Sequence, residues 1–301
     1  MAAVGPEARV AESGQVPLVG ESIWRRVHRY PVIPGLVLTL LVIAGVFGPL
    51  LAPHDPIRSN ILDKHYPPFW VEGGTTRYIL GTDHVGRDVL SRVLYGARVS
   101  LTVAAVSVGS GFIVGTTLGL TAGYFGRFVD EVIMRIVDIW SAMPFLMIAL
   151  VVNIVLGNSM KIVFALLAML AWAGFVRVVR AQTLSLREME YVTAARVSGA
   201  SHARIMWRHL LPGVINTAVV IATLNIGGLI LAEAALSFLG AGIQPPTPAW
   251  GSMVAEGKDW VIAQKWWQSA FPGIAIFLVV MSFNFLGDWM RDHFDPRLRQ
   301  V

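Results

Sequence analysis

Two polar side chains inside long apolar stretches, Asn225 and Glu233, are the first candidates for chemistry in this sequence. A carboxamide donates and accepts hydrogen bonds and a carboxylate accepts them, so either group could contact a polar solute in apolar surroundings. Asn225 comes twelve residues after Gly213, and at about 1.5 Å per helical residue it would lie near the middle of its stretch. Glu233 would lie near the end, where a carboxylate can reach water, so a solvated or hydrogen-bonded structural role competes with a role in solute passage.

A second group of polar residues forms the continuous segment 183–212 between two apolar stretches. Small, hydroxyl and charged residues alternate there, with Gly199 near the centre and Pro212 at the end. This pattern predicts a helix, a sharp turn at Gly199 and a second helix, because glycine adopts positive φ at little cost. The segment has too little apolar area to fold alone and is too long for a minimal connector. We therefore expect another protein to hold it, and a solvated loop is the competing interpretation.

Other kinds of chemistry are excluded by residue type or spacing. The sequence has no cysteine, which excludes disulfides, thiolate metal sites and cysteine nucleophiles, and its seven histidines show no HExxH or similar ligand spacing. It contains neither the G-x-x-x-x-G-K-[ST] motif of ATP-binding loops nor a G-x-S-x-G nucleophile elbow. We expect no catalytic site, no metal and no cofactor in this chain.

The composition identifies the surroundings in which these residues act. Hydrophobic residues make up 55% of the chain and charged residues 14%, whereas a soluble domain has about a quarter charged. The mean hydropathy is +0.62, so apolar side chains must face lipid. The net charge of +5 could suggest nucleic acid, but the basic residues lie between apolar stretches, where membrane topology and the lipid surface explain them better.

The elements that carry the candidate residues are predicted as six spanning helices, since a spanning helix needs about 20 mostly apolar residues. The six stretches cover residues 32–51, 99–124, 133–156, 162–176, 213–235 and 270–290. The third is the least regular, because Arg135, Asp138 and Pro144 interrupt its first half, and we expect Pro144 to bend it. The predicted fold class is an all-α membrane protein with about six transmembrane helices.

Lysine and arginine counts predict the orientation of these helices. Six spans place both termini on one side, and that side holds fifteen basic residues against nine on the other. Basic residues favour the cytoplasmic side, so we expect both termini to be cytoplasmic. The chain then divides into a cytoplasmic segment 1–30, a first helix with an extracytoplasmic loop over 31–98, a membrane core over 99–290 that contains loop 183–212, and a cytoplasmic tail 291–301.

Two patterns concern the second span. Four glycines recur every four residues near one helix face: Gly111, Gly115, Gly119 and Gly123. They predict close helix packing, either within the subunit or against another subunit. The stretch 83–98 before the span has an apolar stripe and a possible Asp88–Arg92 ion pair, which predicts an amphipathic helix at the outer interface, with Thr82 or Asp83 as its cap. Contact with a substrate-delivery protein is the alternative for this stretch.

The segment 183–212 resembles the cytoplasmic EAA loop of ABC-type importer permeases, whose pattern is Glu-Ala-Ala, three residues, Gly, nine residues and Ile-x-Leu-Pro. The residues that match are Ala194, Ala195, Gly199, Leu211 and Pro212. Thr193 and His209 stand where the pattern has Glu and Ile. The run from Glu190 to Arg196 is similar to the Glu-Tyr-Val-x-Ala-Ala-Arg version found in peptide importers.

Further segments resemble the C-type permease subunit of the dipeptide, oligopeptide and nickel group of this family. They are Gly81 to Asp83, Gly86 to Arg92, Tyr95 to Arg98, Ala122 to Gly126, Leu236 to Gly240, Gln244 to Pro246, Gly287-Asp288 and Asp295 to Arg297. The likeness extends from about residue 25 to 299. It implies the type I ABC importer permease fold and a multi-pass location in a bacterial inner membrane.

The resemblance also implies a mechanism and partners. A coupling helix in segment 183–212 would sit in a cleft of a separate ATPase, which binds ATP and Mg, and would transmit its movement to the spans. The coupling residues implied are Glu190, Tyr191, Thr193, Ala194, Ala195, Arg196, Gly199, Ala200 and Ser201. The other implied partners are a related second permease, one or two ATPases in all, and an extracytoplasmic peptide-binding protein.

Two alternatives remain at this point. An ion-coupled secondary transporter would normally show internal repeats and buried ionisable groups, and we find neither a repeat nor a mid-span Asp, Glu or Lys. It would transport when expressed alone, whereas an ABC permease needs its ATPase. Within the ABC interpretation peptides are the expected substrates, with nickel complexes and glutathione as alternatives.

Overall fold

The computed structural model describes residues 31–294; over this range its regular elements are all helical, and the one β feature is an isolated bridge between Thr82 and Asp88. The α-helices are α2 (Val32–Leu51), α3 (Val89–Phe125), α4 (Arg127–Ala142), α5 (Phe145–Leu156), α6 (Met160–Leu186), α7 (Glu190–Val197), α8 (His202–Arg204), α9 (Leu211–Phe238), α10 (Trp250–Gly257) and α11 (Trp267–Phe294). A π-helix (Ile205–Leu210) joins α8 to α9, and two 3₁₀ turns lie at Ile61–Asp63 and Lys258–Trp260. The predicted terminal segments, 1–30 and most of 291–301, fall outside the described residues.

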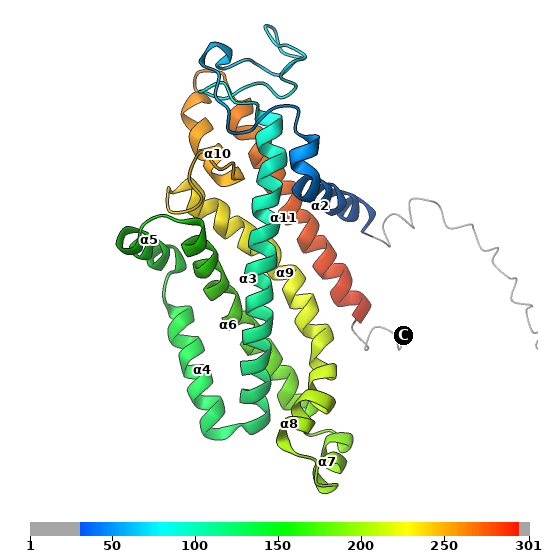
Figure 1. Ribbon diagram of the computed structural model, residues 1–301. Helices are drawn as coiled ribbons and strands as arrows, with labels where there is room; N and C mark the ends of the chain where they lie inside the picture. Colours follow the sequence, from blue (N-terminus) through cyan, green and yellow to red (C-terminus); the bar gives the residue numbers. More distant parts are fainter. Residues whose placement is uncertain (1–30, 295–301) are drawn as a thin grey trace, which may run out of the picture.

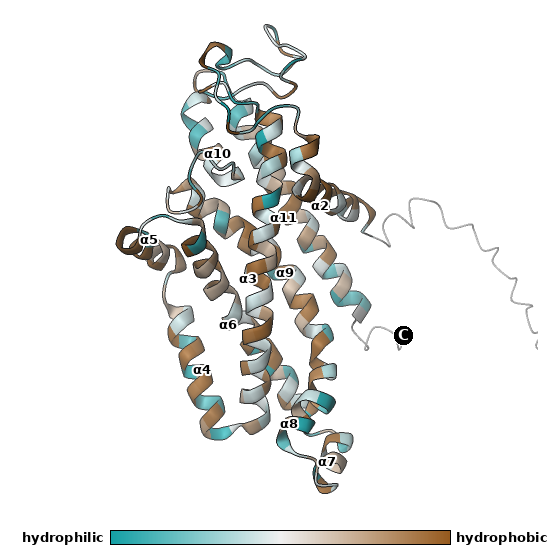
Figure 2. Cartoon of the chain, viewed as in Figure 1, coloured by the Kyte–Doolittle hydropathy of each residue, from teal (hydrophilic) through white to brown (hydrophobic). Residues whose placement is uncertain are grey.

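Five helical segments are long and apolar enough to cross a membrane, and the α4–α5 pair makes a sixth if the two helices form one bent span. This confirms the all-α fold class with about six spans. Figure 2 colours α2 and α5 mostly as hydrophobic, and many of their apolar side chains are exposed, such as Leu50 at 83% and Ile154 at 81%. In a membrane protein these surfaces face lipid or a neighbouring subunit.

The third predicted span, 133–156, is wrong as one continuous helix. The chain bends by 79° between α4 and α5 at Met143 and Pro144. Proline lacks a backbone N–H, so it cannot continue the hydrogen-bond ladder of α4, and it serves instead as the N-cap of α5. The bend at Pro144 was predicted, but its size was not.

The helix expected to lead into the second span is present, but it begins at Val89 and is continuous with the span, which therefore starts ten residues earlier than predicted. Neither Thr82 nor Asp83 caps α3; the carboxylate of Asp88 accepts a hydrogen bond from the backbone N–H of Ser91 at 3.0 Å. From Val89 the helix runs without interruption to Phe125. Asp83, Arg87 and Arg92 of this stretch are buried, and a partner on α10 balances their charges.

That partner is Glu256, which completes a buried group of four charges. Arg87 donates to Asp83 at 2.6 Å and to Glu256 at 2.9 Å. Arg92, which is 1% exposed, also pairs with both carboxylates. The predicted Asp88–Arg92 pair is therefore replaced by pairs across the fold, which attach the loop 52–88 to α10. Burial opposes ionisation of Asp83, but the two arginines outweigh it and hold the pKa of this carboxyl below its usual range.

The four glycines of α3 pack within the subunit, as one of the two interpretations predicted. A Cβ on Gly115 would lie 2.6 Å from the carbonyl oxygen of Trp172, and one on Gly119 would lie 2.8 Å from that of Val176. Both carbonyls belong to α6, so α3 and α6 approach too closely for any side chain. Figure 1 shows α3, α6 and α9 together at the centre of the bundle, with α7 at one end and α10 at the other.

Candidate functional site

The segment around α7 projects from one end of the bundle, between α6 and α9 (Figure 1). Of the eight residues of α7 only Val192 is buried, while Val197 is 84% exposed and Tyr191 is 46% exposed. The predicted coupling residues are therefore on the surface, except Ala195 and Ala200, which are half-buried. The exposed face combines small side chains with Glu190 and Arg196, one charge at each end of the helix.

Gly199 makes the sharp turn that the sequence predicts. Its φ is +77°, and the turn is closed by hydrogen bonds from the N–H of Gly199 to Arg196 and from that of Ala200 to Ala195. This pair of bonds is the Schellman arrangement, in which the residue after the helix adopts the left-handed conformation that favours glycine. A Cβ at Gly199 would meet nothing within 4 Å, so the space beside it is open.

A packed apolar cluster connects the projecting segment to the spans. Val192, Ile205 and Leu210 contribute from the segment and the π-helix, each 0–1% exposed. The spans contribute Leu120, Tyr124, Val179, Val214 and Ala218. The phenol of Tyr124 is also hydrogen-bonded to Nδ1 of His202, at 2.7 Å. Because packed interiors deform little, displacement of α7 would move α3, α6 and α9 rather than be absorbed locally.

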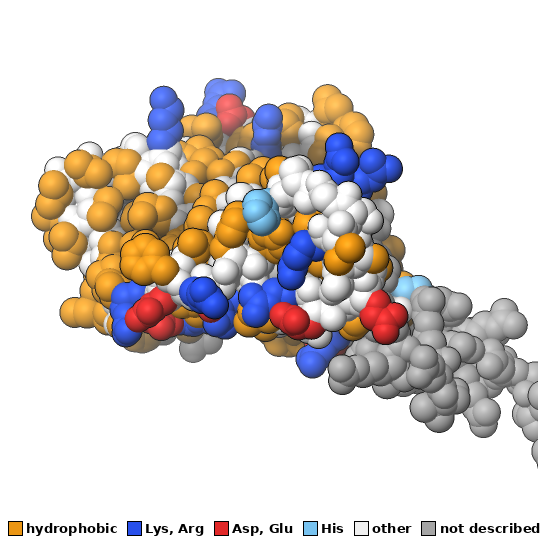
Figure 3. Space-filling view, turned by 90° about the horizontal axis from the view of Figure 1, so that it is seen from below, with side chains coloured by type: hydrophobic (Ala, Val, Ile, Leu, Met, Phe, Trp, Pro, Cys, Tyr) orange, Lys and Arg blue, Asp and Glu red, His pale blue; other side chains and the backbone are white. Residues whose placement is uncertain are grey.

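Figure 3 views the molecule from the α7 end and shows more Lys and Arg side chains than Asp and Glu over this face. Arg196 and Arg204 are among the exposed basic residues of the projecting segment. Excess basic charge is typical of the cytoplasmic side of a membrane protein.

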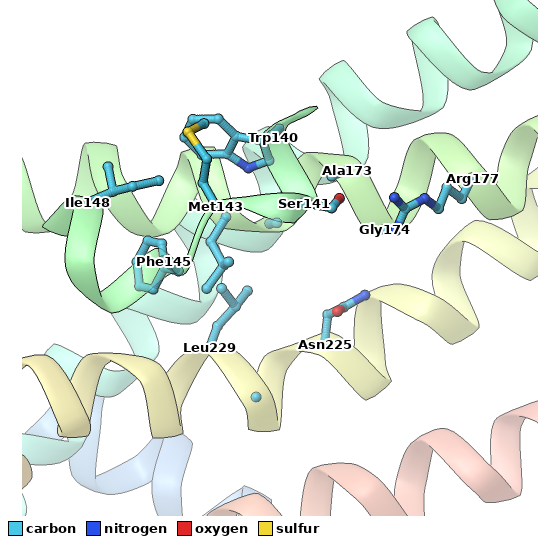
Figure 4. Close-up of a pocket in the computed structure, with 13 residues that line it drawn as sticks. Trp140, Ser141, Met143, Phe145, Ile148, Ala173, Gly174, Arg177, Asn225 and Leu229 are labelled. Atoms are coloured by element: carbon cyan, nitrogen blue, oxygen red, sulfur yellow. The ribbon is translucent and has the colours of Figure 1, made fainter. Parts of the chain in front are cut away.

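A cavity of about 460 Å³ lies where the α4–α5 break faces α6 and α9. Figure 4 shows Ser141, Arg177 and Asn225 toward one end of the cavity and Phe145, Ile148 and Leu229 toward the other. The cavity thus has a polar end and an apolar end. A volume of this size is typical of sites for small organic ligands.

The two polar residues singled out in the apolar stretch lie in different surroundings. Asn225 lines the cavity, and its side-chain amide donates to the carbonyl of Ile221 at 2.9 Å. Glu233 does not line the cavity; it is 1% exposed and accepts a hydrogen bond from Ser237 at 2.6 Å. The prediction that Glu233 reaches water is wrong, because the chain folds back over this carboxylate: the same Ser237 hydroxyl accepts from the N–H of Ile243. The hydrogen bond from Ser237 agrees with the structural role for Glu233, which was one of the two interpretations of this residue.

Sequence reasoning missed Ser141 and Arg177 as cavity residues. A signal was present, since Arg177 and Asp138 are ionisable residues next to or inside apolar stretches, which marks a functional residue by default. The pairing of Arg177 with Asp138 could not be predicted from the sequence, because the two residues belong to α6 and α4 and meet only when these helices pack.

The comparison with protein families matches residues 115–300 to the binding-protein-dependent transport system inner membrane component. The di/tripeptide transport system permease protein DppC of Pseudomonas aeruginosa is 40% identical over 278 residues, which cover 91% of this chain and 90% of the relative. The glutathione transport system permease protein GsiD of Pectobacterium atrosepticum is 40% identical over 279 residues, covering 92% and 90%.

Among solved structures, a chain of the MetNI methionine ABC transporter in inward-facing conformations superposes with a TM-score of 0.53 at 22% identity. The match covers 66% of this chain and 95% of that one. At this identity the likeness concerns the fold, which is that of an ABC importer permease.

Proposed function

The chain belongs to the family of binding-protein-dependent transport system inner membrane components, and from that premise we propose that it is the permease subunit of an ATP-driven peptide importer in a bacterial inner membrane. Relatives named for di/tripeptide and for glutathione transport support peptides as the substrate class, since glutathione is itself a peptide. Family membership makes the chain a transport component, and ATP with Mg would be bound by partner ATPases.

The observation that carries this proposal is that the exposed α7 segment is anchored by a packed apolar cluster. We call this cluster, which joins Val192, Ile205 and Leu210 to the spans, the seat of α7. The outer face of α7 is exposed in this subunit, while Val192 packs its inner face against α3, α6 and α9. A docked ATPase would move this segment as a lever, with Glu190 and Arg196 available for ion pairs. α9 leads from the seat to Asn225 in the cavity, so the movement would reach the solute pathway.

The complete importer would contain a second, related permease that forms the other half of the pathway, one or two ATPase subunits and an extracytoplasmic peptide-binding protein. The α7 end would face the cytoplasm, which agrees with its basic surface. Full peptide uptake after removal of the ATPases would overturn this assignment in favour of an ion-coupled carrier.

The coupling role is tested with Gly199→Val in the complete transporter, reconstituted in proteoliposomes. We expect ATP hydrolysis to persist while peptide uptake per ATP falls, because a β-branched residue cannot hold the turn and its side chain would occupy the open space beside it.

Gly240→Val is the matched control. Gly240 has a φ of +81°, closes the same Schellman arrangement after α9 and likewise has nothing within 4 Å of its Cβ position, but lies near the opposite end of the bundle. Both substitutions carry the same backbone strain, about 1–2 kcal/mol. Equal uptake per ATP in the two variants would refute the coupling role of the α7 segment.

A further inference from the structure

Arg177 gives the cavity a single charge. Of the described residues that line it, Arg177 alone is ionised, since its partner Asp138 lies outside the lining. One N–H of the guanidinium donates to Asp138 at 3.0 Å. A guanidinium has five N–H donors, and the other four donate to none of the described residues. Donors that can bind an anionic group are therefore available at the polar end of the cavity.

The Arg177–Asp138 pair is loose in comparison with its neighbour on the same two helices. Arg177 and Asp138 are 45% and 57% exposed, and one hydrogen bond joins them. Arg180, one turn further along α6, donates through two nitrogens to both oxygens of Asp130, and these side chains are 29% and 17% exposed. Arg180 would have to lose two hydrogen bonds to leave Asp130, whereas Arg177 would lose only one, to an exposed carboxylate, when it turns toward a ligand.

The rest of the cavity defines the other parts of such a ligand. The side-chain oxygen of Asn225 receives no hydrogen bond from the described residues, so it can accept one from a peptide N–H. Phe145, Ile148 and Leu229 at the other end provide apolar contact without polar groups. Such a wall accepts many apolar side chains with little discrimination between them.

We propose that this cavity binds a peptide in transit by its free C-terminal carboxylate, with Arg177 as the residue that selects for that group. A carboxylate accepts two parallel N–H bonds from a guanidinium, which gives stronger and more specific binding than a neutral amide would receive. The permease would thereby discriminate the peptide terminus while remaining permissive for the side chain. This inference rests on the proposed function in peptide import.

The test compares uptake of a tripeptide and of its C-terminal amide by the complete transporter in proteoliposomes. The same binding protein is used throughout, so that its own preference cancels between permease variants. In Arg177→Gln we expect at least a tenfold fall in kcat/KM for the free acid, because a hydrogen bond to a charged group is lost, and little change for the amide. The preference for the acid should therefore fall about tenfold.

Two variants separate recognition from structure. Asp138→Asn frees Arg177 from its partner and should keep the preference for the acid, and Arg180→Gln should lower uptake of both forms equally if it lowers it at all. Equal losses for acid and amide in both Arg177→Gln and Asp138→Asn would overturn the proposal, since they would show that the ion pair acts only to hold α4 against α6.

An anionic lipid headgroup could supply a similar charge. Vesicles of phosphatidylcholine with and without phosphatidylglycerol distinguish the two sources. The proposal expects the same acid preference in both, and loss of that preference when phosphatidylglycerol is present would overturn it, since the headgroup would then occupy Arg177. A wild-type transporter that carries neither peptide would instead contradict the proposed function, whereas one that carries both, with an unchanged ratio in Arg177→Gln, would contradict this inference alone.

Discussion

Replacement of Arg92 by methionine tests the buried charge group that attaches the loop 52–88 to the bundle. Two arginines and two carboxylates sum to zero in the folded protein, and Arg92 pairs with both Asp83 and Glu256. Arg92→Met leaves the carboxylates of Asp83 and Glu256 facing Arg87 alone. Loss of one partner from a buried ion pair costs about 3–5 kcal/mol. Glu256 is 18% exposed and can regain some water, so we expect the lower end of that range.

The free energy of unfolding can be measured on the purified chain in detergent, by denaturant titration followed through helical circular dichroism. Arg92→Met together with Glu256→Met restores a net charge of zero, and we expect this double variant to be more stable than the sum of the two single changes by about 2 kcal/mol. Arg58→Met, at an exposed position of the same loop, serves as the control and should change stability by less than about 0.5 kcal/mol. A loss below 0.5 kcal/mol in Arg92→Met, or strict additivity in the double variant, would refute the reasoning.

Three further predictions use the same unfolding measurement. Gly115→Ala should destabilise the protein by more than about 2 kcal/mol, because the new methyl group would meet the carbonyl of Trp172 at 2.6 Å, whereas Gly109→Ala, with nothing within 4 Å, should stabilise α3 by about 0.5–1 kcal/mol. Val192→Ala should cost about 2–3 kcal/mol, since it leaves a void in the seat of α7, and a change under 0.5 kcal/mol would contradict that packing. Because the folded state lowers the pKa of Asp83, the ionised carboxylate stabilises the fold fully above the unfolded aspartate pKa of about 3.9. This contribution to the free energy of unfolding is lost as pH falls through the lower pKa of the folded state. Asp83→Asn should be less stable at neutral pH and should not show this loss of stability at acid pH.

The sequence by itself determined the class of the protein, most of its spans and the projecting segment. These features depend on local properties: a run of about 20 apolar residues, a glycine at a helix end and a proline that interrupts a helix leave direct traces in the order of residues. Segment 183–212 was found for this reason, and so was the turn at Gly199.

Only the tertiary structure decided which charges are buried and what lines the cavity. The stretch before α3 has the pattern of an amphipathic surface helix, but Glu256, more than 150 residues away, turns its charges inward. Glu233 is covered by a fold-back of its own chain, and Arg177 meets Asn225 at the cavity from a different helix. Pairings between distant segments depend on how the helices pack. The residue pattern of one segment therefore does not indicate which distant residue will neutralise its charges.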